Sequence, residues 1–338
     1  IQIIHPNPAH RNSRNTLAVI LSSMQYIHDT NFYRKLATEY SYDDAKKLIL
    51  NWKRENTNDK AIFSNIVATE LISHLLDKNK TREICYKSLQ LMFIHCSEFS
   101  EGKIKGTIVP TFYELLTRYF YYKESSFKVF NSNIFSIASN IAKSDTIEFT
   151  TNYKEEISQV IEFRKQEIDS IVDNFERYIK SFNDEGIADW YIFQTNTTLK
   201  KEFESYMKKG QFNQIIGLLL FKLATSESKS EITDDATSKY KESFNHEFST
   251  SIKFFTDNIL NKLTQIKKME YFYHPATDPK KRWNSFYDMQ IIFATEYENS
   301  FKRPTILITS EEKINCCFNE DKKGSFCIKT DTYLKNYS

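Results

Sequence analysis

Residues 24–32 read Met-Gln-Tyr-Ile-His-Asp-Thr-Asn-Phe, a mainly apolar stretch that runs directly into polar, turn-forming residues. Residues 305–309, Thr-Ile-Leu-Ile-Thr, have the same layout and are followed by Ser-Glu-Glu. Short apolar runs bounded in this way are typical of buried strands in a parallel sheet. Strand and helix signals alternate around both runs, so they predict an α/β fold whose sheet is built from both ends of the chain.

The region between these ends has a different pattern. Apolar residues recur there at helical spacing, with charged opposite faces, over residues 112–122, 155–182, 199–208, 212–224 and 236–269. We therefore expect a three-layer, parallel-sheet domain formed by residues 15–100 plus 280–338. An all-α helical bundle, residues 101–279, is predicted to be inserted into it.

Composition limits the classes of function. The 338 residues carry 46 Lys and Arg against 44 Asp and Glu, so any nucleic-acid binding must use a local basic surface rather than the overall charge.

No apolar run approaches the roughly 20 residues that cross a bilayer, and the first residues lack the layout of a signal peptide. Five cysteines, an odd number, favour reduced thiols. We expect a cytoplasmic protein with no membrane partner.

Four acidic residues occupy related positions around the predicted sheet. Asp29 closes the first strand, Glu70 lies on the helix after the second, Asp288 lies on the helix before the strand at 305–309, and Glu311 follows that strand. Ligands of open parallel sheets bind beyond the carboxyl ends of the strands, where these side chains would meet. Each also has an ordinary interpretation, as a helix cap, a helix start or a solvated helix face.

Carboxylates that lie close together raise one another's pKa unless a cation compensates them. Mg²⁺ and Mn²⁺ are the hard ions that prefer such oxygen ligands, and they can activate water against a phosphodiester. The predicted ligands, which are also the predicted catalytic residues, are therefore Asp29, Glu70, Asp288 and Glu311. Glu312 is adjacent to Glu311 and leaves the identity of the fourth ligand open.

Five segments, taken together, resemble the motifs of PIN-domain nucleases. In chain order they are Met-Gln-Tyr-Ile-His-Asp-Thr-Asn-Phe at 24–32, Phe-Ser-Asn-Ile-Val-Ala-Thr-Glu-Leu at 63–71, Tyr-Asp-Met-Gln-Ile-Ile-Phe-Ala at 287–294, Ile-Leu-Ile-Thr-Ser-Glu at 306–311, and Cys-Ile-Lys-Thr-Asp-Thr-Tyr-Leu at 327–334. The resemblance covers both chain ends and none of the middle. It implies a PIN-like sheet flanked by helices, dependence on Mg²⁺ or Mn²⁺, and cleavage of RNA, usually single-stranded.

The chain departs from that family at two places. Glu311 stands where the family has Asp, and the helical insertion is much longer than the short helical stretch of compact members. Around the acids, Thr30, Asn31, Thr309 and Ser310 are candidates to orient the ligands or water, with Asn31 the best placed of them. Lys280, Lys281 and Arg282 are candidates to hold a phosphate backbone, although charge runs are usually solvated faces.

These observations predict a metal-dependent endoribonuclease acting on single-stranded RNA. The family's habit suggests a toxin or a phage-defence effector, with the helical insertion mediating self-assembly or binding a regulatory protein. Two alternatives stay open. One is a catalytically weak, PIN-like module that binds RNA or a protein, and the other is a structure-specific DNA nuclease.

Overall fold

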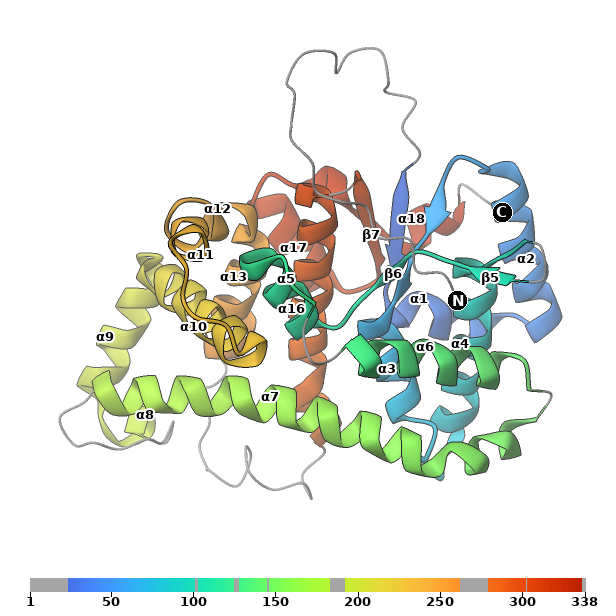
Figure 1. The fold of residues 1–338 in the computed structure, drawn as a ribbon, viewed down its shortest axis with the longest axis horizontal. Helices are drawn as coiled ribbons and strands as arrows, with labels where there is room; N and C mark the ends of the chain where they lie inside the picture. The colour runs from blue at the N-terminus through green and yellow to red at the C-terminus, as the bar shows by residue number, and fades with distance from the viewer. Residues whose placement is uncertain are drawn as a thin grey trace, which may run out of the picture.

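The computed structural model describes residues 24–100, 103–124, 128–144, 146–182, 192–261, 279–301 and 303–335. Most of these residues are helical, and the strands are short (Figure 1). Residues 15–23 of the predicted α/β domain lie outside the described residues.

Four parallel strands form the main sheet, in the order β2-β1-β7-β8. They are β1 (Gln25–His28), β2 (Lys60–Ala61), β7 (Thr305–Thr309) and β8 (Cys327–Lys329). The two central strands, β1 and β7, come from opposite ends of the chain, and His28 lies opposite Ile308. The prediction that both ends build one parallel sheet is therefore confirmed.

The chain around residues 61–63 is divided between two sheets. The backbone N–H of Ile62 donates to the carbonyl of Tyr26 at 2.9 Å, but that of Phe63 donates to Thr107 at 3.0 Å. The chain thus leaves β1 and continues as β3 (Phe63–Ser64), parallel to β6 (Ile108–Val109).

Two strands lie in the region that was predicted to be all-α. They are β6 and β5 (Lys103–Lys105), which pairs in antiparallel fashion with β4 (Glu98–Ser100). The prediction of an all-α insertion from residue 101 is therefore wrong at its start. These strands are too short to show an alternating pattern, and β6 depends on a partner distant in the sequence.

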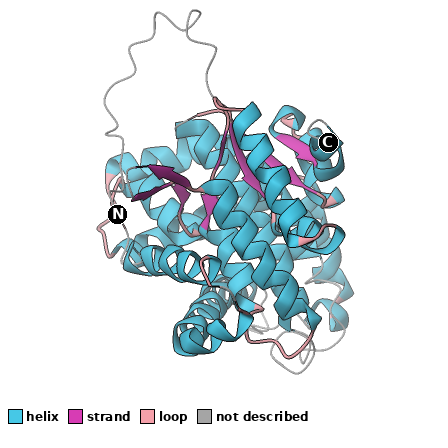
Figure 2. Ribbon diagram, turned by 90° about the vertical axis from the view of Figure 1, so that its right-hand side faces the viewer, coloured by secondary structure: helices cyan, strands magenta, loops and turns pink. Residues whose placement is uncertain are grey.

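Helices lie on both sides of the strands (Figure 2). Rings from three helices surround the buried His28 of β1: Trp52 on α2 (Tyr42–Glu55), His95 on α4 (Lys80–Cys96) and Tyr333 on α18 (Thr330–Lys335).

The helix α1 (Thr30–Glu39) continues directly from β1 and packs on α4. Elsewhere α16 (Pro279–Phe301) packs against β7 and against α3 (Asn65–Ser73), while α17 (Glu312–Glu320) follows β7 and packs against β8.

The middle of the chain supplies the remaining helices. They are α5 (Phe112–Tyr121), α6 (Lys128–Ala142), α7 (Lys154–Phe182), α8 (Ile192–Thr195), α9 (Thr197–Lys208), α10 (Gln211–Ser228), α11 (Asp234–Lys239), α12 (Asn245–Glu247) and α13 (Ser249–Phe254). Two 3-10 helices (Ile147–Tyr153 and Gly324–Phe326) and two π-helices (Tyr240–Phe244 and Phe255–Leu260) complete the described elements.

These middle helices pack directly on the two chain ends. The long helix α7 crosses beside α3 (Figure 1), and α13 packs on α16 and α17. The buried apolar side chains of the middle and of both ends form one core. The proposed division into two domains stays a prediction, but the helical part is joined to the sheet by a continuous apolar interior.

Two further features follow from the described residues. All five cysteines are free in the structure, and all but Cys316 are buried. None of the described helices is both long enough and apolar enough to span a bilayer.

Candidate functional site

The carboxyl ends of β1 and β7 lie side by side, and an acidic residue caps the helix that follows each strand. Asp29 is the N-cap of α1, and Glu311 is the N-cap of α17. The backbone N–H of Asp29 donates to the carbonyl of Ile308 at 2.9 Å, which continues the pairing of the two strands to their ends. Because parallel strands end at one edge of the sheet, two residues far apart in the chain are brought together there.

Hydrogen bonds through Thr309 and Asn31 connect Asp29 and Glu311. The Thr309 hydroxyl donates to Asp29 Oδ2 at 2.6 Å and accepts from the backbone N–H of Glu311 at 3.0 Å. Asn31 Nδ2 donates to Glu311 Oε1 at 2.8 Å. Thr309 and Asn31 therefore connect the two carboxylates through hydrogen bonds.

The other two acids come from helices on either side of this edge. Glu70 lies on α3, and its Oε2 accepts from the Thr30 hydroxyl at 2.5 Å. Asp288 lies on α16, which packs against α3 and β7, and its carboxylate makes no hydrogen bond or ion pair with the described residues. Strand ends and helix packing thus gather the four acids from both ends of the chain.

Burial and mutual repulsion act on these carboxyl groups together. Burial, followed by the charge of Glu311, raises the pKa of Asp29 to about 6 even though the Thr309 hydrogen bond opposes the shift. Burial and the charge of Asp29 raise the pKa of Glu70 to about 7. The pKa of Asp288 is raised well above its usual range by burial and by the charges of the other three acids. Asp29, Glu70 and Asp288 therefore lie in the fields of neighbouring carboxylates, and burial and repulsion favour their protonated forms until a cation enters.

Oxygen donors of this kind suit a hard divalent cation. Across the described ranges, however, no group of three or more His, Cys, Asp or Glu side chains has an arrangement that would hold a metal ion. Three of the acids instead direct an oxygen at Thr309, Thr30 or Asn31. The chemistry of the donors, four carboxylates, fits Mg²⁺ or Mn²⁺.

Glu312 lies apart from this cluster. Its Oε2 forms an ion pair with Lys329 Nζ at 2.7 Å, and its side chain is 67% exposed. The hydrogen bond from Lys329, followed by its charge, lowers the pKa of Glu312, in contrast to the raised pKa values of Asp29, Glu70 and Asp288. Of the two alternatives that the sequence left open, Glu311 is therefore the one that the structure brings to the other acids.

The remaining predicted residues are less informative. Ser310 is exposed, and its side chain makes no hydrogen bond with the described residues. Lys280, Lys281 and Arg282 fall in the first turn of α16, and their side chains lie outside the described residues.

Sequence reasoning missed a buried arginine next to the cluster. Arg164, on α7, is fully buried and forms an ion pair with Glu167. Its Nη2 donates to Gln290 at 2.5 Å, and its guanidinium lies 4.5 Å from the ring centre of Tyr287. Arg164 therefore contacts one residue before and one residue after Asp288 in the sequence. The charge of Arg164 also lowers the pKa of Glu70.

A signal for this arginine exists in the sequence. Ile157, Val160, Ile168 and Ile171 are buried at helical spacing along α7, and Arg164 occupies the position between them on the same face. An arginine on the apolar face of an amphipathic helix requires a buried partner, which here is Glu167.

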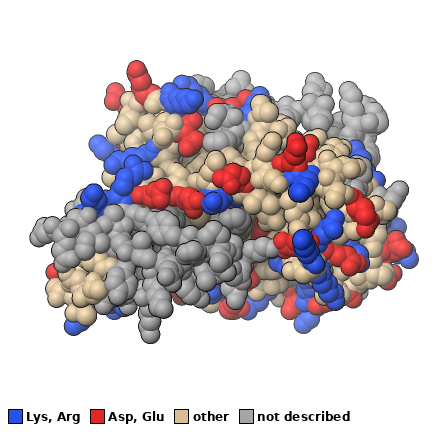
Figure 3. Space-filling view, turned by 90° about the horizontal axis from the view of Figure 1, so that it is seen from below, with Lys and Arg blue, Asp and Glu red and all other residues tan. Residues whose placement is uncertain are grey.

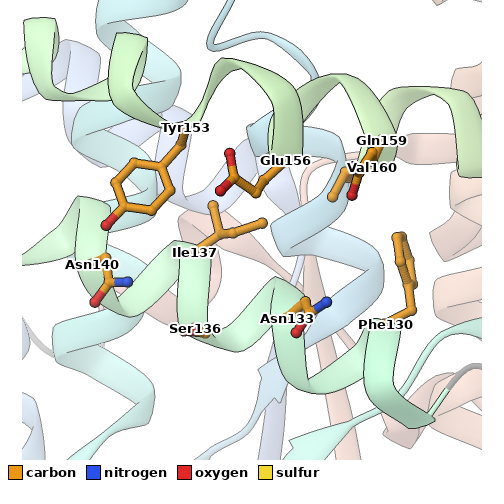
Figure 4. A pocket seen from close by; sticks show the side chains of 9 residues that line it. All are labelled: Phe130, Asn133, Ser136, Ile137, Asn140, Tyr153, Glu156, Gln159 and Val160. Atoms are coloured by element: carbon orange, nitrogen blue, oxygen red, sulfur yellow. The ribbon is translucent and has the colours of Figure 1, made fainter.

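A separate hollow of about 300 Å³ lies between α6 and the start of α7 (Figure 4). Ile137 and Val160 are its buried lining residues, Phe130 and Tyr153 lie at its two ends, and Glu156 is its one charged residue. It holds none of the four clustered acids and no basic side chain. The candidate site is therefore the acidic cluster at the sheet edge.

Comparison with known protein families, with curated proteins and with solved structures finds no match.

Proposed function

We propose that this chain is a metal-dependent phosphodiesterase that cleaves single-stranded RNA. The observation that supports the proposal is the gathering of Asp29, Glu70, Asp288 and Glu311 at the carboxyl ends of the two central strands, where their charges act on one another. The motif resemblance to PIN-domain nucleases contributes the expectation of RNA as the substrate.

Asp29, Glu70, Asp288 and Glu311 would hold Mg²⁺ or Mn²⁺ in this proposal. The bound metal would supply an activated water and stabilise the departing oxygen of the phosphodiester. Thr309, Thr30 and Asn31 donate hydrogen bonds to three of these carboxylates and would release oxygen lone pairs to the ion.

The direct test is incubation of the protein with single-stranded RNA in Mn²⁺. Cleavage should be seen with wild type, and should be absent with chelator or with Asp29→Asn. A parallel single-stranded DNA substrate separates an endoribonuclease from a DNA nuclease. Near-wild-type cleavage by Asp29→Asn in Mn²⁺ would contradict the assignment.

Metal binding can be measured without turnover. An ion that binds only the folded state raises the melting temperature as its concentration exceeds the dissociation constant. We expect Mn²⁺ to raise the melting temperature of the wild type and to have little effect on Asp288→Asn, because that variant lacks one of the four carboxylates. An equal rise in both proteins would place the ion elsewhere.

The two adjacent glutamates provide a sharper comparison. Glu311→Gln is expected to lower the cleavage rate by about tenfold or more, because it changes a proposed ligand. Glu312→Gln breaks only an exposed ion pair with Lys329 and should stay close to wild type. Cleavage rates of the two variants at saturating Mn²⁺ measure the difference, and the reverse order would exchange their roles.

Two observations favour a second candidate function. The described residues contain no ready-made metal group, and Glu311 replaces the Asp of the family motif. An RNA-binding module that does not cleave would be consistent with both facts. Binding of RNA that is unaffected by chelator, in the absence of cleavage, identifies this alternative.

A further inference from the structure

Three basic residues act on the acidic cluster, and they differ in what their side chains contact. The charges of Arg34 and Arg164 lower the pKa of Glu70, and the charge of Lys313 lowers that of Asp288. Arg164 is fully buried and bonded to Glu167 and Gln290, so it cannot reach a ligand. Arg34 and Lys313 lie nearer to solvent.

Arg34 lies on α1, one turn after Thr30. Residues four apart share a face of a helix, and Thr30 uses this face to bond Glu70. Lys313 is exposed in the first turn of α17, two residues after Glu311. The Asn31–Glu311 hydrogen bond joins the starts of α1 and α17. The two basic residues therefore belong to the two helices that begin at the cluster.

Neither Arg34 nor Lys313 makes an ion pair or a side-chain hydrogen bond with any residue in the described ranges. Two other lysines near these helices behave differently: Lys35 lies on α1, and Lys329 lies at the end of β8, beside the first turn of α17. Lys35 contacts Asp331 at 2.5 Å, and Lys329 contacts Glu312 at 2.7 Å. Of the three basic residues whose charges act on the buried acids, Arg34 and Lys313 are therefore the two whose hydrogen-bonding groups are not taken up by other described residues.

A phosphodiester strand that approaches four acids needs local positive charge. The protein as a whole supplies little, because its formal net charge is +2. Acidic and basic side chains are also interspersed over the described part of the face in Figure 3. Cations beside the acidic cluster would supply this attraction where the strand binds.

We propose that Arg34 and Lys313 bind phosphate groups of the substrate strand beside the acidic cluster. This inference rests on the proposed function, since it assigns the contacts that would hold the RNA while the acids hold the metal. Arginine suits this role because its planar fork bonds phosphate oxygens in pairs, and lysine acts as a point charge.

The test measures binding alone, in an Asp29→Asn background that leaves the strand intact. Fluorescence anisotropy with a labelled, single-stranded oligouridylate gives the dissociation constant at several salt concentrations. Arg34→Ala and Lys313→Ala are each expected to weaken binding about fivefold and to reduce the salt slope by about 0.7. Arg34→Lys should recover part of the affinity, because the charge is kept.

Lys222→Ala is the matched control. Lys222 is exposed on α10, in the helical part of the chain, and its removal should leave affinity and salt slope unchanged. The inference is overturned if Arg34→Ala and Lys313→Ala match this control, or if the Asp29→Asn protein does not bind the strand at all. Circular dichroism of each variant separates loss of binding from loss of fold.

The outcome is separable from that of the proposed function. If the wild type does not cleave in Mn²⁺ but the two alanine variants bind RNA more weakly, the nuclease is refuted and the phosphate contacts of Arg34 and Lys313 are supported. If cleavage depends on Asp29 but the variants bind RNA as tightly as before, the nuclease is supported and the phosphate contacts are refuted.

Discussion

Replacing Asp29 with asparagine is expected to stabilise the metal-free protein at alkaline pH while it removes cleavage. The folded protein raises the pKa of Asp29 from 3.8 to about 6, so the native state holds the proton more tightly than the unfolded chain. The contribution of Asp29 to the free energy of unfolding is therefore fully present below about pH 4 and is lost as the pH rises to about 6. Above about pH 6 the buried, ionised carboxylate lowers the free energy of unfolding by about 3 kcal/mol at most. Asparagine is uncharged and does not carry this cost.

The measurement is urea unfolding of wild type and Asp29→Asn in chelator, at pH 8 and at pH 4. The variant should be more stable by about 1–3 kcal/mol at pH 8, and the difference should disappear at pH 4. Asp173→Asn, at an exposed position on α7, is a suitable control with no expected gain. A loss of stability in Asp29→Asn at pH 8 would mean that the carboxylates are not crowded.

Replacing Arg164 with methionine is expected to be the most destabilising of these substitutions. The change leaves the buried carboxylate of Glu167 without its cation and Gln290 without its donor, although Gln290 Nε2 still donates to Glu167 at 3.1 Å. Breaking a buried ion pair by removing one partner costs about 3–5 kcal/mol. Chemical unfolding at neutral pH measures the loss.

A second substitution shows the cause of that loss. Arg164→Met combined with Glu167→Gln also removes the uncompensated buried charge of Glu167. The double variant should therefore be more stable than Arg164→Met alone. Arg177→Met, at an exposed position on the same helix, should have little effect. Additive losses in the double variant would show that Arg164 does not compensate Glu167.

This network also connects the middle of the chain to the site. Arg164 comes from α7, while Tyr287 and Gln290 flank Asp288 on α16. Since Arg164 also acts on Glu70, the helical part contributes to the electrostatics of the acidic cluster. The two chain ends alone would leave that cluster without its buried cation.

Local sequence patterns were sufficient for much of the fold. The apolar runs predicted β1 and β7, and their polar ends predicted that Asp29 and Glu311 would follow strands of one parallel sheet. Helical spacing predicted α5, α7, α9 and α10 within a few residues of their observed bounds. These features depend on the alternation of apolar and polar residues over one element, which a sequence records directly.

Other features required the tertiary structure because they depend on partners distant in the chain. The division of the strand near Ile62 and the existence of β6 depend on which backbone lies alongside, and β6 has only two residues. The choice of Glu311 over Glu312 depends on whether Asn31 or Lys329 lies opposite. Arg164 is compatible with solvent or core by residue type, and only the packing of α7 on α3 and the contacts of Arg164 with α16 determine that it is buried. Sequence by itself thus determined the elements and the acidic residues at their ends, whereas long-range packing decided which side chains meet, because contact energies between distant residues leave no local pattern.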